Sequence, residues 1–430
     1  MSTVFKELSK MKREWDLIEK GEYDVIVVGA GPAGVAAAIN AGRQGVKTLL
    51  IEALGRVGGI STAGYMSHWT GTVGNKTYWE ILERSNKKTG EDARSIYIDP
   101  DWLTVTYIEM LEETGVDCLL YTTVCDVLVE KNTVKGVVCC NKNGLTVYRS
   151  KVVIDGSGDG DVAYKAGAEY ILGRETDGKM QPATLMFKIA GVDTERAVFP
   201  GSFETLVPTE KGELQALAKR LLPHPAGHVL LYRSPVKGIV TVNMTNAIDV
   251  DGTKAEDLTK AECICRKQMQ PIVAFLREYV PGYENCYIIG SASLIGIRET
   301  RHFKGVRQLT EYDILEAKQF EDYVVYGAHF NFDVHNITGA GLDKTGVQHH
   351  FKQKQPYTIP YGCLVPEKID GLLLSGRNIS GTHLAHSSFR VMPICVGTGE
   401  ACGVAAALAV KTGRKVRDIT AKEIQKIIRR

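Results

Sequence analysis

The spacing of hydrophobic residues near the start of the chain predicts a strand, a helix and a second strand. Residues 23–29 (YDVIVVG) form a nearly continuous β-branched run, which is typical of a buried strand. Residues 32–42 are mostly small and predict a helix, and residues 47–52 (KTLLIE) form a second apolar run. A βαβ unit has a length of about 30 residues, as this segment does. The charged residues 1–22 predict a helix that leads into the first strand.

Several short hydrophobic runs come next, with turn residues between them. Asn132 and the pair Asn143-Gly144 favour tight turns. The pattern predicts an antiparallel meander, with strands at residues 118–121, 125–131, 135–140 and 146–150. Residues 151–155 (KVVID) predict a separate buried strand that ends in a glycine-rich turn. Before the meander, residues 100–114 have the apolar spacing of a helix.

The middle of the chain predicts a second region, built from strands around one long charged helix at residues 254–279. The strands are expected at residues 183–190, 228–233, 238–245, 286–297 and 324–334. After them, residues 371–375 and 397–411 return to a strand, a glycine-rich loop and a helix. We therefore predict an α/β fold with two domains. A Rossmann-like domain, with a parallel sheet and an antiparallel meander, covers residues 1–182 and 346–430, and an inserted α+β substrate domain covers residues 183–345.

The turn between the first strand and helix carries a nucleotide-binding motif, Gly29-Ala30-Gly31-Pro32-Ala33-Gly34. In such a motif Gly29 permits the tight turn, Gly31 admits a pyrophosphate, and Gly34 lets the helix pack closely on the sheet. Unpaired N–H groups at the helix N-terminus then face the phosphates. Glu52 ends the second strand, where its carboxylate accepts hydrogen bonds from ribose hydroxyls. These residues predict a bound dinucleotide.

A glycine pair and a glycine-rich acidic turn favour FAD over NAD. The pair Gly58-Gly59 follows the acidic strand end and is typical of two-dinucleotide-binding flavoproteins. The turn reads Asp155-Gly156-Ser157-Gly158-Asp159-Gly160-Asp161 and resembles the segment that approaches FAD after the meander. A calcium loop is the alternative interpretation of this turn, although Ala166 stands where position 12 of such a loop carries glutamate.

A third glycine cluster lies near the C-terminal end of the chain. Gly376-Arg377-Asn378 follow an apolar strand, at the edge where open α/β sheets bind ligands. Gly397-Thr398-Gly399-Glu400 is expected to open the alanine-rich helix. A helix N-terminus at that point would stabilise negative charge on a reduced flavin.

Composition narrows the class of protein. The chain has 430 residues, 44% of them hydrophobic, and a formal net charge of +2, which excludes a disordered chain. Its 52 basic side chains are balanced by 50 acidic ones, which argues against an electrostatic nucleic-acid binder. No run approaches the roughly 20 apolar residues of a membrane span. The ten cysteines show no CxxC pair, no metal site is predicted, and the lack of an apolar leader favours the cytoplasm.

Taken together, these motifs resemble the FAD-dependent oxidoreductase family, whose FAD domain is of the glutathione-reductase type. The resemblance is carried by DVIVVGAGPAGVAAA, IEALGRVGG, VVIDGSGDGDVAYKAGA, IGIRETRHFKG and AHSSFRVMPICVGTGEACGVAAALA. The chain is also similar, more distantly, to fumarate reductases and thiazole synthases. The resemblance implies flavin redox chemistry and adds Ala53, Arg56 and Val124 to the expected cofactor contacts. No second dinucleotide motif and no CxxxxC pair are present, so the electrons are expected to come directly from the organic substrate.

Flavin redox steps also need a group that exchanges the substrate proton, and histidine suits this role near neutral pH. The candidates in order are His335, His383, His386, Arg298 and His68. Arg298 is a candidate because guanidinium groups bind carboxylates. A structural role for each histidine, and an internal ion pair between Arg298 and Glu299, are the alternatives. Tyr361 is either a substrate contact or part of the core.

We expect an enzyme that transfers hydride from a small polar metabolite, such as a sugar, hydroxy acid or amine, to the flavin. A histidine accepts the proton, and an unidentified acceptor reoxidises the flavin. One alternative is a reductase of an activated double bond, fed by an external donor. Another is a dinucleotide-binding protein without turnover. The expected partner is a small-molecule substrate, with no nucleic acid and no membrane span, and self-association into a homo-oligomer is left open.

Overall fold

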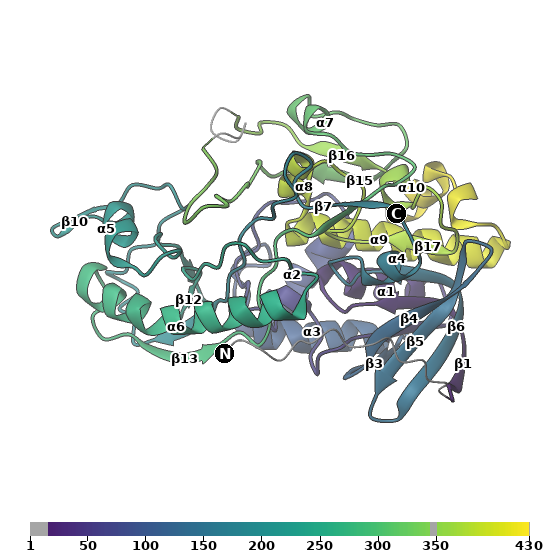
Figure 1. Ribbon diagram of the computed structural model, residues 1–430, viewed down its shortest axis with the longest axis horizontal. Helices are drawn as coiled ribbons and strands as arrows, with labels where there is room; N and C mark the ends of the chain where they lie inside the picture. Colours follow the sequence, from purple (N-terminus) through teal and green to yellow (C-terminus); the bar gives the residue numbers. More distant parts are fainter. Residues whose placement is uncertain (1–15, 345–350, 430) are drawn as a thin grey trace, which may run out of the picture.

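The computed structural model describes residues 16–344 and 351–429 and consists of a large sheet region and a smaller, second sheet region (Figure 1). The large sheet has the strand order β3-β2-β1-β6-β5-β4, and β17 pairs with β6. Its strands are β1 (Ile18–Val28), β2 (Thr48–Ile51), β3 (Asp117–Leu119), β4 (Thr123–Glu130), β5 (Thr133–Asn141), β6 (Gly144–Asp155) and β17 (Leu372–Leu374). The predicted α/β class, with a parallel sheet extended by antiparallel strands, is confirmed.

The register of the central strands brings the sequence motifs to one edge of this sheet. β1 runs parallel to both β2 and β6, with Val28 opposite Ile51 on one side and Asp155 on the other. β17 runs parallel to β6 and places Leu374 opposite Asp155. The carboxyl ends of four strands that are far apart in sequence therefore lie together, and a glycine-rich or acidic segment follows each.

Three details of the predicted sheet are wrong. Residues 118–121 do not belong to the meander, because β3 follows helix α3 (Pro100–Glu113) and pairs parallel with β2, as a strand after a helical crossover does. Residues 146–150 and 151–155 are one strand, β6, since no turn residue interrupts them. The first strand begins at Ile18, and residues 18–22 are therefore not helical. The rest of the predicted N-terminal helix lies largely outside the described residues.

Helices cover the large sheet and its glycine-rich edge. α1 (Pro32–Arg43) packs against α9 (Met392–Thr412), with α2 (Lys76–Thr89), α3 and α10 (Ala421–Ile428) around them. The smaller elements nearby are α4 (Asp161–Lys165), α7 (Glu311–Leu315), α8 (His383–Phe389), η1 (Gly59–Ser61), η3 (Tyr361–Leu364) and η4 (Val416–Asp418). Two further strand pairs, β7 (Tyr170–Leu172) with β14 (Arg301–Phe303) and β15 (Tyr323–Ala328) with β16 (Tyr357–Pro360), complete this region.

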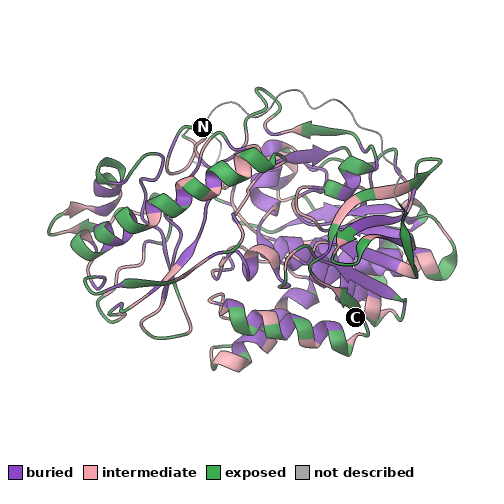
Figure 2. Cartoon of the chain, turned by 60° about the horizontal axis from the view of Figure 1, so that its bottom comes forward, coloured by how far each residue is buried: buried purple, intermediate pink, exposed green. Residues whose placement is uncertain are grey.

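Helix α9 differs from its prediction in two respects. It begins at Met392 and not at Gly397, because Pro393 occupies its first turn, where a missing N–H costs little. Within the described residues it is also the one helix that is long and apolar enough to cross a membrane, which the sequence analysis overlooked. However, 89% of its most apolar stretch is buried inside the protein (purple in Figure 2), as expected of a core helix.

The second region has its own sheet and its own core. The strand order is β11-β12-β8-β13, formed by β8 (Phe187–Ala190), β11 (Leu231–Arg233), β12 (Val240–Val242) and β13 (Tyr287–Ser291). The predicted long helix is α6 (Ala255–Tyr279), which covers this sheet with α5 (Leu214–Leu221); a small hairpin joins β9 (Pro208–Thr209) to β10 (Gly212–Glu213). These strands are shorter than predicted. The apolar residues beyond their ends lie in loops and not in the sheet.

The hydrophobic cores bear on the predicted division of the chain. Phe187, Ile272 and Leu276 belong to the core of the second region. Phe303 and Phe332, which the prediction assigned to the inserted domain, are buried in the core of the large sheet instead. The two-domain division with boundaries at 182 and 346 stays a prediction.

Candidate flavin and substrate site

A cavity of about 810 Å³ lies between the glycine-rich edge of the large sheet and the second sheet region. Its first wall consists of residues that the sequence assigned to the cofactor, namely Gly29, Gly31, Pro32, Ala33, Glu52, Ala53, Gly59, Gly156, Ser157, Gly158, Asp159, Gly376 and Arg377. Its other wall is contributed largely by the second region and by the segment 330–335. The three candidate residues Arg298, His335 and His68 also line the cavity.

The N-terminus of α1 is open toward this cavity. Gly31 is its N-cap residue, no side chain caps it, and a Cβ added at Gly31 would meet no atom within 4 Å. By contrast, a Cβ at Gly34 would collide with the carbonyl oxygen of Gly29, and one at Gly29 would lie 2.6 Å from the Gly156 oxygen. Gly31 therefore leaves room for a ligand, whereas Gly29 and Gly34 allow close packing of the backbone. The free N–H groups and the helix dipole suit a pyrophosphate.

Glu52 lies at the end of β2, with its side chain in the cavity wall and almost fully buried. Its Oε2 accepts a hydrogen bond from the Ala30 N–H at 2.6 Å, and Oε1 accepts one from the Leu54 N–H at 2.9 Å. These bonds fix the carboxylate beside the glycine turn. Gly59 crosses close by, since a Cβ there would lie 3.0 Å from the Gly31 Cα. The arrangement fits the ribose of a dinucleotide.

The acidic turn after β6 is held by internal bonds. Asp155 is fully buried and accepts hydrogen bonds from Ser157 and from the Ala163 N–H in α4. Burial raises the pKa of Asp155 to about 6. Asp159 pairs with Arg377 at 3.0 Å, and Asp161 pairs with Arg301 at 2.9 Å. These pairs engage the carboxylates that a calcium ion would require, so the turn favours the cofactor interpretation.

Several predicted cofactor residues lie outside the cavity lining. Gly397, Gly399 and Glu400 occupy the second turn of α9 or beyond, and Glu400 accepts hydrogen bonds from the Thr77 N–H at 2.7 Å and the Asn75 side chain at 3.1 Å. Glu400 therefore holds the N-terminus of α2 and does not face the cofactor wall. The remaining residues outside the lining are Gly34, Arg56, Gly58, Val124, Asp155 and Asn378. Of these, Arg56 pairs with Asp101, and Asn378 donates to the Asp155 carbonyl.

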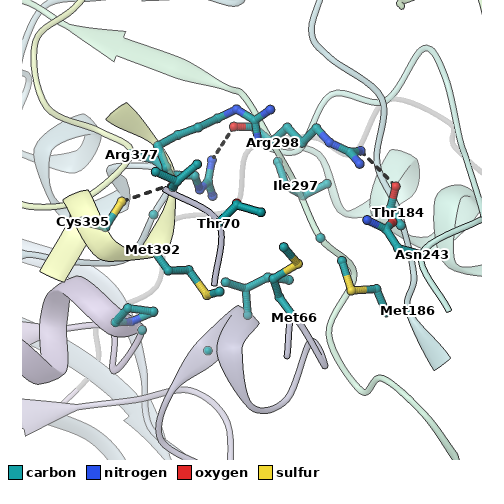
Figure 3. Close-up of a pocket in the computed structure, with 18 of the residues that line it drawn as sticks. Met66, Thr70, Thr184, Met186, Asn243, Ile297, Arg298, Arg377, Met392 and Cys395 are labelled. Carbon is teal, nitrogen blue, oxygen red and sulfur yellow. Dashed lines mark hydrogen bonds between the residues drawn. The ribbon is translucent and has the colours of Figure 1, made fainter. Parts of the chain in front are cut away.

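Two partly buried arginines and one aspartate meet at the other wall. The side chain of Arg298 donates to the Pro182 carbonyl at 2.5 Å. It also donates to Thr184 Oγ1 at 2.9 Å (Figure 3). Arg390 donates to Asp333 Oδ2 at 2.9 Å, while its Nε is buried without a partner. Burial, and then the charge of Arg390, lower the pKa of Arg298 to about 10. The group thus carries more positive than negative charge, which suits an anionic ligand.

His335 stands next to this charged group. Its Nε2 lies 3.3 Å from Asp333 Oδ2, and its ring meets the edge of Phe203. Burial, reinforced by the charge of Arg298, lowers the pKa of His335 to about 4. The imidazole is therefore neutral at pH 7, the form that accepts a proton.

His68 lies elsewhere in the cavity wall, stacked on the ring of Tyr232 with 4.8 Å between the ring centres. Its Nδ1 is buried without a hydrogen-bond partner, and burial lowers its pKa to about 4. His68 too is neutral at pH 7.

His383 and His386 lie on α8, outside the cavity lining. His383 Nδ1 is 2.5 Å from Glu299 Oε1, and His302 Nε2 is 2.8 Å from the same oxygen. Glu299 thus binds histidines and not Arg298, so the expected alternative of an Arg298–Glu299 ion pair is wrong. Tyr361 is a core residue, since its buried hydroxyl donates to the Val416 carbonyl.

The apolar part of the cavity wall is not among the residues predicted from the sequence. Met66, Met186, Phe203, Leu230 and Tyr232 all contribute to it. Figure 3 shows Met66, Met186 and Met392 on the side opposite Arg298. Ordinary core residues give no local signal of this kind, because only the tertiary fold turns them toward a ligand.

The similarity of the chain to known proteins agrees with this geometry. A family model described as "FAD dependent oxidoreductase" matches residues 24–428. The chain belongs to this family. The predicted family, the FAD cofactor and the assignment as an oxidoreductase enzyme are therefore confirmed.

Individual relatives of this FAD-dependent oxidoreductase differ in activity. The chain is 26% identical over 226 residues to digeranylgeranylglycerophospholipid reductase 1 of Methanococcoides burtonii, covering 44% of this chain and 52% of the reductase, about half its length. It is 28% identical over 204 residues to the thiamine thiazole synthase of Pyrococcus abyssi, covering 44% of this chain and 79% of the synthase.

The fold also matches solved structures. A geranylgeranyl bacteriochlorophyll reductase-like protein of Thermoplasma acidophilum has a TM-score of 0.50 and 14% identity, covering 94% of this chain and 82% of its own. The flavin-dependent brominase Bmp2 has a TM-score of 0.50 and 13% identity, covering 95% and 83%. At such identities the likeness shows the fold alone.

Proposed function

We propose that this FAD-dependent oxidoreductase oxidises a small hydroxy acid or amine that carries a carboxylate and an apolar body. The observation that supports this most directly is the cluster of Arg298, Arg390, Asp333 and His335, which faces the cavity across from the cofactor wall. Two guanidinium groups against one carboxylate leave a binding place for one anionic group. A sugar, which the sequence also allowed as substrate, has no anionic group to occupy this place.

In the proposed reaction, bound FAD supplies the hydride acceptor. Arg298 and Arg390 bind the substrate carboxylate and orient the carbon that is oxidised. His335 donates its Nε2–H to Asp333, which leaves Nδ1 as the basic atom that accepts the proton from the hydroxyl or amine. The imidazole is neutral before the step, because its pKa of about 4 lies well below pH 7.

The apolar residues of the wall determine the rest of the specificity. Met66, Met186 and Phe203 surround the space beside the charged group, and Met side chains adapt to irregular shapes. Desolvation by these side chains also strengthens the attraction between the arginines and a carboxylate. We therefore assign the body of the substrate to an aliphatic or aromatic group.

Anaerobic reduction of the bound flavin, followed by its absorbance, tests this proposal. A panel of 2-hydroxy acids and amino acids with apolar side chains, each paired with its methyl ester, should bleach the wild-type protein only with the free acids. Arg298→Gln should weaken substrate binding at least about tenfold, the loss of one charged hydrogen bond. Arg298→Lys should recover part of it, and Arg307→Gln, at an exposed surface arginine, should change nothing.

The histidine is tested with the same assay. His335→Asn should lower the rate of flavin reduction by about 10²–10⁴-fold, the usual contribution of a general base, with little change in substrate affinity. Equal reduction rates in wild type and His335→Asn would contradict the assigned role. Bleaching by the esters as well as the acids would contradict the carboxylate assignment.

A second candidate function is reduction of an activated double bond with electrons from an external donor. The apolar wall supports it, as does the similarity to a protein named as a digeranylgeranylglycerophospholipid reductase. In that case no metabolite bleaches the flavin, and an activated alkene reoxidises it after reduction with dithionite. A dinucleotide-binding protein without turnover is not proposed, because the chain belongs to an enzyme family.

We also propose a cytoplasmic location. All ten cysteines are free in the structure, including the sequence neighbours Cys139 and Cys140. Free thiols persist in a reducing compartment.

A further inference from the structure

We propose that Glu299, His302 and His386 form a binding site for one divalent transition-metal ion of the zinc or iron(II) type. One potential ligand atom from each residue lies within 4.8 Å of the other two. The three side chains are buried, with exposed fractions of 1%, 3% and 2%. No other such trio occurs in the part of the chain that the structure describes. Two imidazole nitrogens and one carboxylate oxygen are a ligand set that suits these ions.

Separate segments of the chain hold the ligands in place. His302 lies in β14, which pairs with β7, Glu299 lies two residues before that strand, and His386 lies on α8. Thr382 caps α8 by accepting a hydrogen bond from the Ala385 N–H. Because both segments are anchored, the ligand atoms approach one another before any ion binds.

Further contacts orient the carboxylate, as outer contacts do at metal sites. His383 Nδ1 lies 2.5 Å from Glu299 Oε1, and the Gln181 N–H donates to Oε2 at 3.2 Å. The rings of His302 and His386 meet edge to face, with 4.8 Å between their centres. Small movements of these rings bring the nitrogens to metal-bonding distance.

Two ring nitrogens at this position have no hydrogen-bond partner, namely His302 Nδ1 and His386 Nδ1, and both are buried. A buried polar atom without a partner costs free energy. An ion that coordinates through one of these lone pairs removes that cost. This observation is independent of the ligand spacing and points to a missing partner of the imidazoles.

The surrounding charges do not forbid a cation. The nearby guanidinium groups of Arg377 and Arg390 are paired with Asp159 and Asp333. None of the three ligands lines the flavin cavity. The ion would instead join the segment after Arg298 to the helix that precedes Arg390. It therefore has a structural role, which is to hold in place the two arginines of the proposed carboxylate site.

Metal analysis of the purified, flavin-loaded protein tests the proposal. After demetallation with a chelator, the protein should bind one equivalent of Zn²⁺ per chain in a calorimetric titration, with a rise in melting temperature. Cobalt(II), used as a coloured substitute, should give the absorption of a nitrogen- and oxygen-bound ion. His386→Asn and His302→Asn should each weaken binding by at least about 10–100-fold. The matched control His329→Asn, outside the cluster, should bind as wild type does.

Flavin content keeps the test independent of folding. A variant that retains its flavin absorbance but loses the metal supports the site. If His386→Asn loses both its flavin and its metal, the cobalt(II) spectrum of the wild-type protein tests the site instead. Coordination by imidazole nitrogens changes the absorption of the bound cobalt ion. Absence of stoichiometric binding of Zn²⁺ and of anaerobic Fe²⁺ by the wild type, or equal binding by both histidine variants, would overturn the proposal. The readout does not depend on turnover, so it stands apart from the proposed function.

Discussion

Two glycines of the nucleotide-binding motif have different roles in this structure. Gly31 faces open space at the N-terminus of α1, and its backbone is extended with φ of −70°, which any residue adopts. Gly34, one turn later, is packed against the backbone of Gly29. The first glycine therefore serves the ligand, and the second serves the fold.

This difference predicts distinct effects of two alanine substitutions. Gly31→Ala should leave the melting temperature of the flavin-free protein within about 2 °C, since the methyl group meets nothing, but should reduce FAD content because it occupies the approach to the pyrophosphate. Gly34→Ala should lower the stability by about 1–3 kcal/mol or more, because its Cβ collides with backbone. Thermal unfolding and flavin absorbance per chain measure both effects. A normal flavin content in Gly31→Ala would contradict the ligand role.

At the scale of elements, the contact between α1 and α9 explains residues that the sequence analysis assigned to the cofactor. A Cβ at Gly399 would collide with the Ala33 carbonyl, and one at Gly403 with the Ala37 carbonyl. Small residues on both helices therefore allow their backbones to touch. The side chain of Glu400, the residue after Gly399, extends from the same helix and accepts a hydrogen bond at the start of α2.

Replacement of Glu400 distinguishes a role at the cofactor from a role in holding the start of α2. Glu400→Ala leaves the Thr77 N–H without a side-chain acceptor and leaves the Asn75 amide with only the longer bond to the Val324 carbonyl, so we expect a loss of about 1–3 kcal/mol in the free energy of unfolding. The flavin spectrum of the folded protein should not change. Denaturant unfolding provides the measurement, and Lys411→Ala, at an exposed position near the end of α9, is the control with an effect within about 0.5 kcal/mol. A selective change in flavin redox potential would restore the cofactor role.

In the molecule as a whole, the burial of histidines makes the stability depend on pH. The pKa of His68 and of His335 falls from 6.5 to about 4, and that of His228 to about 3, mainly because of burial. The unfolded chain therefore binds more protons than the folded chain between about pH 4 and 6.5. The contribution of these neutral histidines to stability is complete above about pH 6.5 and is lost as the pH falls toward 4.

We accordingly expect the free energy of unfolding to decrease from pH 7 to pH 5, by up to about 1.4 kcal/mol per pH unit for each of these histidines. Asp155 and Glu400 oppose the trend, because burial raises the pKa of Glu400 and raises that of Asp155 to about 6, which favours the folded state as the pH falls. The three histidines outnumber these two carboxylates, so the net slope stays positive. Chemical denaturation at a series of pH values measures the slope, which should be shallower in His68→Gln. A stability that is constant or higher at pH 5 would contradict this account.

Local patterns along the chain are enough to predict those features that depend only on neighbouring residues. The apolar run, the turn of Gly29 and Gly31 and the acid Glu52 are local, because strand, turn and helix obey short-range rules of backbone geometry. They were sufficient for the fold class and the cofactor. The places of Glu400 and of residues 118–121 in the fold could not be predicted in this way, because they depend on helix packing and on strand order.

Which side chains share the cavity depends on how distant segments of the chain pack together, and no local pattern predicts it. Arg298, Asp333 and Arg390 come from three segments whose approach depends on how the second region packs on the large sheet. The same is true of Glu299 and His386, which no spacing in the sequence connects. Ligand-binding groups and metal ligands act through distance in space, and the chain sets that distance only when its cores have formed.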